Sequence, residues 1–169
     1  MRALFVTVLT WFPLAAAVAQ EPKSKSFSVW VRRDAAPVRR VVAAPLETVW
    51  DVLPNAFRDL GYSGGRSARE GERIFLTPSL TIKGRLYEGE LNSDYLDCGR
   101  TAAGQFAADV YEVRFAILAR LVPERDSTSV EIVIDGTARD RTQSSNAVFC
   151  TGTGKIETAL LQGLENHLR

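Results

Sequence analysis

The sequence predicts an α+β domain in which a curved antiparallel sheet packs on a long C-terminal helix. A helical pattern at 45–60 precedes a series of strand-like segments, and an amphipathic segment at 154–168 closes the chain. Helices that are separated by consecutive strands are typical of α+β folds, whereas doubly wound sheets alternate the two. The expected order is a strand, a helix, four to six strands and a final helix.

Residues 1–19 have the pattern of a secretory signal peptide. Arg2 is followed by an apolar run and then by Ala17-Val18-Ala19, which is typical of a cleavage site. We expect cleavage after Ala19 and export of the chain to the periplasm or the extracellular space. The alternative to a cleaved signal peptide is an uncleaved N-terminal anchor. The apolar run, interrupted by Pro13, is short for a bilayer span, which argues against this alternative. No transmembrane segment is expected in the mature chain.

The rest of the chain is expected to hold a leader at 20–37 and a single domain at 38–169. The leader is polar and flexible, with a possible edge strand at 27–33. Removal of 1–19 takes away one basic side chain, so 20 basic side chains balance the 20 acidic ones. This balance argues against nucleic acid as a partner, because nucleic acids are bound through excess Lys and Arg.

Two helices are predicted from apolar residues that recur every three or four positions. The first covers 45–60, begins at Pro45 and ends before Gly61, a residue suited to a left-handed C-cap. Pro54 lies inside it and is expected to kink the helix or divide it in two. The second covers 154–168 and is amphipathic.

The expected strands are 38–44, 73–77, 80–87, 93–98, 111–122 and 129–140. The last two alternate apolar and polar residues over a long stretch and are joined by a polar turn at 123–127. They form the most pronounced hairpin pattern in the sequence. Residues 65–73 are expected to form a loop.

Cys98 and Cys150 are the two cysteines of the chain, and in an exported protein an isolated pair predicts a disulfide bond. Two free thiols or a metal pair are the alternatives, although no further ligand accompanies them. The Gly- and Ala-rich loop at 98–109 begins at Cys98 and contains Gly104 and Phe106. It is either a tethered crossover or a binding loop, because function concentrates in such loops.

Catalytic motifs are weak in this sequence. Gly61-Tyr62-Ser63-Gly64-Gly65 matches the G-x-S-x-G pattern of serine hydrolases, and His167 lies downstream. A nucleophile elbow needs a strand before the serine and a helix after it, whereas here the helix comes first. Glu88 and Glu90 form a carboxylate pair, but exposed carboxylates usually do no acid–base work. We expect no metal site and no cofactor.

The segment 38–61 resembles the opening of the helix-grip proteins. In START-type lipid-transfer domains a strand leads into a Pro-initiated helix that carries a Val-Trp pair and then divides into two short helices. The residues that carry the resemblance here are Val41, Val42, Ala43, Ala44, Pro45, Val49, Trp50 and Leu53, with Pro54 at the point of division. The order of elements is also similar to that in the domains of BamC, a lipoprotein of the outer-membrane barrel-assembly machinery.

The resemblance implies a fold in which a sheet grips a long C-terminal helix. It implies no functional residue, and this chain has no anchor cysteine after the expected cleavage site. Together with the weak catalytic motifs, it predicts an exported, non-enzymatic binding domain for a hydrophobic small molecule or an envelope protein. The alternatives are an envelope assembly module with a filled core and, third, a serine hydrolase.

Overall fold

The computed structural model of the chain describes residues 36–69, 71–82, 84–142 and 147–169. All of them belong to one compact unit, Val31–Arg169. The expected signal peptide at 1–19 and the expected strand at 27–33 lie outside the described residues.

The described residues form one antiparallel sheet and three α-helices, which confirms the α+β prediction. The strands are β1 (Val38–Val42), β2 (Gly65–Arg69), β3 (Glu72–Leu76), β4 (Leu80–Ile82), β5 (Leu96–Asp97), β6 (Glu112–Glu124), β7 (Ser127–Arg139) and β8 (Val148–Gly152). The helices are α1 (Leu46–Asp59), α2 (Ala107–Val110) and α3 (Lys155–His167), with a 3-10 turn, η1, at Asn92–Asp94.

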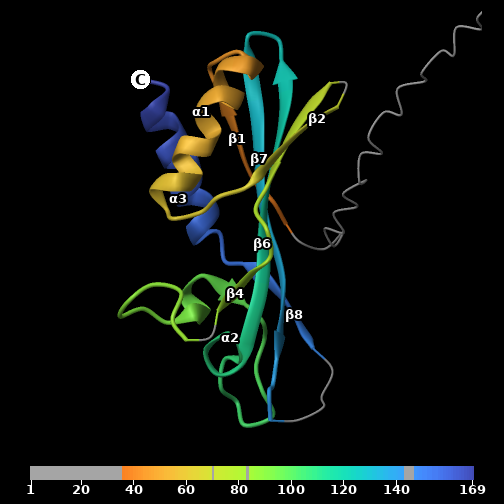
Figure 1. Cartoon of the computed structure of the whole chain (residues 1–169), viewed down its shortest axis with the longest axis vertical. Helices are drawn as coiled ribbons and strands as arrows, with labels where there is room; N and C mark the ends of the chain where they lie inside the picture. The colour runs from red at the N-terminus through yellow and green to blue at the C-terminus, as the bar shows by residue number, and fades with distance from the viewer. Residues whose placement is uncertain (1–35, 70, 83, 143–146) are drawn as a thin grey trace, which may run out of the picture. The chain divides into compact units, whose positions relative to one another are not determined.

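The long hairpin of β6 and β7 is the centre of the sheet, as its alternating pattern predicts (Figure 1). Each strand has 13 residues, and they pair from Glu112↔Arg139 to Glu124↔Ser127. At the turn end of the hairpin, β3 pairs with β6 and β1 pairs with β7. At the other end, β4 pairs with β6 and β8 pairs with β7.

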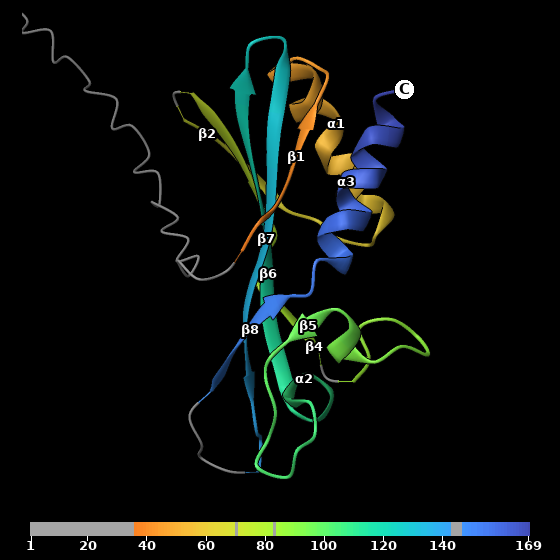
Figure 2. The ribbon, with the colours of Figure 1, turned by 180° about the vertical axis from the view of Figure 1, so that it is seen from behind.

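Helices α1 and α3 lie side by side on one face of the sheet (Figures 1 and 2). Their apolar stripes and the inward side chains of the sheet form one continuous hydrophobic cluster. The largest side chains buried in it are Leu53, Phe57, Leu96, Phe115, Ile117, Leu121, Ile132, Ile134, Ile156, Leu160, Leu161 and Leu164. These large residues fill the space between sheet and helices.

The structure differs from the sequence-based expectation in its shorter strands. Seven strands separate α1 from α3, where four to six were expected, because β2 and β8 were not predicted. The segment 65–73, expected as a loop, supplies β2 and the start of β3. The strand expected at 80–87 ends at Ile82, and the one expected at 93–98 is reduced to two residues after η1.

Helix α1 runs through Pro54 as a single element, so the expected division into two helices is wrong. Proline has no backbone N–H, which leaves the carbonyl of Trp50, four residues earlier, without its helical donor. Arg66 in β2 replaces that donor: its Nη2 lies 2.5 Å from the Trp50 carbonyl oxygen. The Arg66 guanidinium also stacks on the Trp50 ring, with Cζ 4.7 Å from the ring centroid.

We therefore expect the contribution of Arg66 to depend on Pro54. Arg66→Met keeps the apolar stem and removes the donors, so it should lower the free energy of unfolding by about 1–2 kcal/mol. In a Pro54→Ala background, residue 54 itself donates to Trp50, and the cost of Arg66→Met should fall to about half or less. Urea denaturation of the four proteins measures this coupling.

Arg58→Met is the matched control, because Arg58 lies on α1 with Pro54 and, among the described residues, its side chain donates only to the Asn55 side chain, at 3.0 Å. Its cost should be small and equal in both backgrounds. Equal costs of Arg66→Met in the two backgrounds would contradict the assignment of Arg66 as the substitute donor.

Candidate functional site

The disulfide between Cys98 and Cys150 is present, as the sequence predicts, and joins the end of β5 to the middle of β8. In the β5–β8 register, Leu96 lies opposite Gly152 and Asp97 opposite Thr151, so the two cysteines follow as the next cross-strand pair. Both are buried. The bond therefore fixes the start of the candidate binding loop to the sheet.

Backbone hydrogen bonds close the loop between Gly99 and Ala107. The Ala107 N–H donates to the Gly99 carbonyl at 3.0 Å, and the Thr101 N–H donates to Gln105 at 2.9 Å. The Gly104 N–H donates to Thr101 at 2.9 Å. Gly104 has a φ of +80°, a conformation that other residues adopt only with strain. The loop is thus a closed and internally bonded turn rather than an open crossover.

Phe106 and Arg100 form an exposed pair on this loop. Phe106 is 43% exposed, and the Arg100 guanidinium lies over its ring at 4.0 Å from the centroid. The Nη1 of Arg100 donates to the Gly104 carbonyl at 2.7 Å. A large apolar ring and a fixed cation, two features that are common at protein interfaces, therefore occur together at this surface.

A polar junction connects this part of the chain to the N-terminus of α3. The Lys155 Nζ lies 2.9 Å from Glu90 Oε2 and 4.3 Å from the Tyr95 ring centroid. The Tyr95 hydroxyl donates to the same Glu90 carboxylate, and the hydroxyls of Tyr62 and Tyr87 are 2.7 Å apart. Glu90 is therefore a structural partner of Lys155 and Tyr95.

Glu157, which sequence reasoning did not single out, is the buried carboxylate of this junction. It is 2% exposed, and it accepts hydrogen bonds from the backbone N–H groups of Gly154 and its own residue. Its Oε2 is buried and has no hydrogen-bond partner among the described residues. A Cβ at Gly152 would lie 1.8 Å from Glu157 Oε1, so a side chain at position 152 would require this carboxylate to move.

Burial raises the pKa of Glu157, and the backbone donors at the start of α3 oppose that rise. Burial also raises the pKa of Tyr62, and the hydrogen bond between its hydroxyl and that of Tyr87 adds to the effect. Neither group is placed to exchange protons with solvent directly, because both side chains are buried.

The residues of the hydrolase motif are not assembled. Ser63 is exposed in the turn between α1 and β2, and no hydrogen bond joins it to His167 in the described part of the chain. The His167 Nε2 instead lies 2.7 Å from Asp59 Oδ2, which ties the C-terminal ends of α1 and α3 together. Ser63 follows a helix and precedes a strand, the reverse of a nucleophile elbow.

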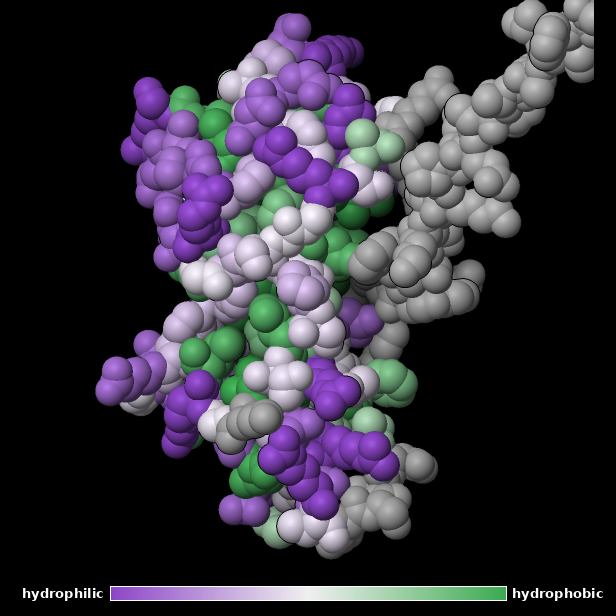
Figure 3. All heavy atoms as spheres, in the orientation of Figure 1, coloured by the Kyte–Doolittle hydropathy of each residue, from purple (hydrophilic) through white to green (hydrophobic). Residues whose placement is uncertain are grey.

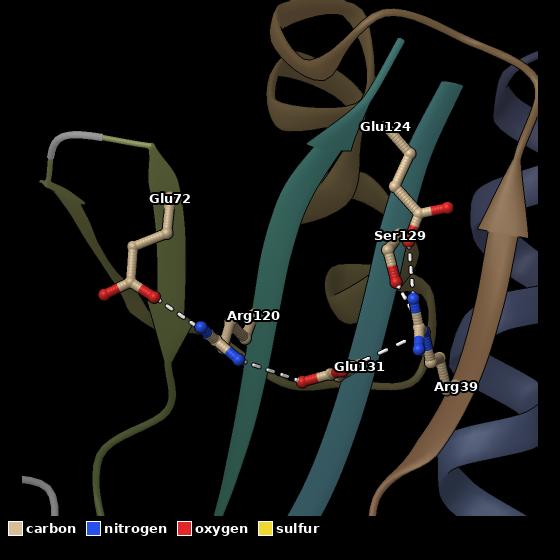
Figure 4. Close-up of polar contacts among 6 residues, drawn as sticks. All are labelled: Arg39, Glu72, Arg120, Glu124, Ser129 and Glu131. Carbon is tan, nitrogen blue, oxygen red and sulfur yellow. Dashed lines mark hydrogen bonds and ion pairs between the residues drawn. The ribbon is translucent and has the colours of Figure 1, made fainter. Parts of the chain in front are cut away.

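The sheet face opposite the helices carries a row of alternating charges across β3, β6, β7 and β1 (Figure 4). Its members are Glu72, Arg120, Glu131, Arg39 and Glu124, with the Ser129 hydroxyl beside Arg39. Arg120 Nε lies 2.8 Å from Glu72 Oε2, and Arg39 Nη2 lies 2.5 Å from Glu124 Oε1. Each arginine of the row has carboxylate partners, so the row does not form an anion site.

Other site types find no support in the described ranges. Among those residues, no group of three or more His, Cys, Asp and Glu side chains is arranged to hold a metal ion. Within the same part of the chain, no helix combines the length and the apolar character that a membrane crossing requires. No family model matches the sequence, and no curated protein has significant sequence similarity to it.

Loss of the disulfide should destabilise the protein and loosen the loop. We expect Cys98→Ala with Cys150→Ala to lower the free energy of unfolding by about 2–4 kcal/mol, because the bond constrains the unfolded chain. The amides of Thr101, Gly104 and Ala107 should exchange hydrogen faster, since their bonds depend on the anchored loop. Chemical denaturation and amide exchange measure the two effects.

Each single cysteine variant serves as a control, because it breaks the same bond and should lose a similar amount of stability. Peptide mapping without reduction establishes that the wild-type bond is formed. Unchanged exchange at the three amides in the double variant would show that the loop does not depend on the bond.

The buried Glu157 carboxyl should make stability depend on pH. Its pKa is raised above the ordinary 4.5, so the folded state binds the proton more tightly than the unfolded state. The associated stability is complete below pH 4.5 and is lost as the pH rises from there through the folded-state pKa. Glu157→Gln, which cannot ionise, should flatten this decline.

Urea denaturation at a series of pH values from about 4 to 8 tests this expectation. Glu88→Gln is the matched control, because Glu88 is exposed and its replacement should leave the slope unchanged. A decline of the same slope in wild type and Glu157→Gln would assign it to another group.

Proposed function

We propose that the mature chain is an exported, non-enzymatic binding domain whose partner is a protein. The observation that carries the proposal is the filled interior between the sheet and the helices. Twelve large side chains are fully buried there in one cluster, so a ligand would have to displace well-packed residues. This favours recognition at the surface over the enclosure of a hydrophobic small molecule.

The depression between β1 and the end of α3 does not change that preference. It has a volume of about 250 Å³ and is lined by Val41, Val42, Ala43, Glu165, Leu168 and Arg169. Small-molecule sites typically have about 300–1,000 Å³ and enclose most of the ligand.

In the face shown in Figure 3, hydrophilic residues cover most of the part that carries α1 and α3, and hydrophobic atoms reach the surface below it.

Export to the periplasm or the extracellular space is proposed from the signal-peptide pattern. The disulfide supports it, because disulfide bonds persist in oxidising environments. The helix-grip resemblance adds that the sheet and terminal helix serve as a scaffold. The candidate contact surface is the loop 99–106, which combines an exposed ring with a fixed backbone.

Native mass spectrometry of the protein purified from its own host tests the proposal. We expect a stoichiometric protein partner and no retained lipid. A lipid that co-purifies in equal amount and resists dilution would overturn the choice of partner. Ester hydrolysis that disappears in Ser63→Ala would overturn the non-enzymatic assignment.

A further inference from the structure

We propose that the pair formed by Arg100 and Phe106 binds a protein segment that carries a carboxylate next to an apolar side chain. The inference rests on the proposed function, because it names the chemistry of the partner at the candidate loop. It follows from three properties of the pair: its exposure, the unused donors of the guanidinium and the rigidity of the loop.

Among the residues that the structure describes, Arg100 has no carboxylate partner, which distinguishes it from the arginines of the sheet face. None of the ion pairs that join described residues includes it. The nearest acidic side chain in the sequence, Asp97, uses Oδ1 to accept the Gly99 N–H at 2.9 Å. Arg100 therefore presents a positive charge that the described part of the chain leaves uncompensated.

The guanidinium is held in a position that leaves donors available. Within the described part of the chain only Nη1 has an acceptor, the Gly104 carbonyl, while the flat face of the group rests on the Phe106 ring. A guanidinium has five N–H donors in one plane, and a carboxylate can accept two of them in parallel. Because stacking fixes that plane, the charge-assisted bonds have a defined direction.

Apolar surface adjoins this cation. Phe106 precedes α2 and Val110 ends it, four residues apart on a single helical turn, and they are 43% and 46% exposed. The Asp109 N–H donates to the Phe106 carbonyl at 3.1 Å, which holds that turn closed. Phe106 and Val110 thus expose apolar side chains at the two ends of this short turn, close in the chain to the cation.

The rigidity of the loop lowers the cost of binding. The disulfide, the hydrogen bonds of Gly99 and Thr101 and the stacked arginine order these residues before a partner arrives. Pre-ordered side chains lose less conformational entropy on binding. Aromatic residues and arginine are also the residue types that contribute most to protein interfaces. A carboxylate with an apolar neighbour complements both groups.

A random linear peptide library, displayed on phage and selected on the immobilised processed protein, tests the proposal. We expect enrichment of peptides that place Asp or Glu beside an aromatic or large aliphatic residue. Phe106→Ser and Arg100→Gln should each weaken binding of such a peptide by about 10- to 30-fold in fluorescence anisotropy. Arg100→Lys should restore only part of the loss, because it keeps the charge without the planar donors.

A double-mutant cycle shows whether Arg100 contacts the carboxylate. Replacing the peptide Asp by Asn should weaken binding to wild type but barely change binding to Arg100→Gln. Val41→Ser and Arg58→Gln are matched controls on other exposed residues and should bind like wild type. An intact Cys98–Cys150 bond and unchanged stability establish that each variant is folded.

Three results would overturn the proposal: enrichment of neutral or basic peptides, no enrichment at all, or independent effects of the peptide and Arg100 changes. These results leave the proposed function in place if a protein still co-purifies from the host. A retained lipid with no protein partner would instead remove the proposed function itself, so the two failures are distinguishable.

Discussion

The pairing of β6 with β7 is the interaction on which the rest of the structure depends. One end of this hairpin is flanked by β3 and β1, beneath the helices, and the other by β4 and β8, beside the candidate loop. Gly136 is where a side chain would obstruct the pairing, because a Cβ there would lie 2.5 Å from the Arg114 carbonyl oxygen. The absence of a side chain at Gly136 leaves room for Phe115, which lies opposite it on β6.

Because the hairpin is continuous, the helices and the candidate loop share one rigid support. The hydrophobic cluster provides most of the stabilisation, since burial of apolar area is the dominant favourable term in folding. A filled cluster also leaves recognition to surface groups, and the disulfide keeps one such group, the loop 99–106, attached to the sheet. In the proposed function, stability and recognition would therefore belong to different parts of the chain.

The sequence was sufficient for the elements whose own residues have a strong period. The hairpin, α1 and α3 were predicted because their apolar residues recur at two or at three to four positions. The segment 65–69 has no such alternation, and its strand depends on pairing with β3 and on Arg66. The segment 80–87 ends early as a strand because Asn92 bonds the Leu86 N–H and the Gly84 carbonyl.

The candidate site was predictable to a similar extent. Cys98 and Cys150 are paired because two cysteines allow one intramolecular bond, and Phe106 is exposed on the loop that follows. The stacking of Arg100 on Phe106 was not predictable, since it depends on how the loop closes on itself. Glu157 was also missed, because a single glutamate in an amphipathic helix gives no sign that it turns inward.

The polar junction at the start of α3 explains why the fold accommodates the buried Glu157 carboxylate. Hydrogen bonds and ion pairs require defined directions, whereas apolar contacts do not. The contacts of Lys155, Glu90 and Tyr95 therefore fix the orientation of α3 more than they add to the stability of the fold. The Glu157 carboxylate accepts backbone hydrogen bonds at the first turn of α3, and Gly152, which has no side chain, leaves space for it. The helix thus begins at a fixed point beside the loop region. The energetic cost of one buried carboxylate is thus balanced against a defined position for the start of α3, which follows the disulfide-bonded strand β8.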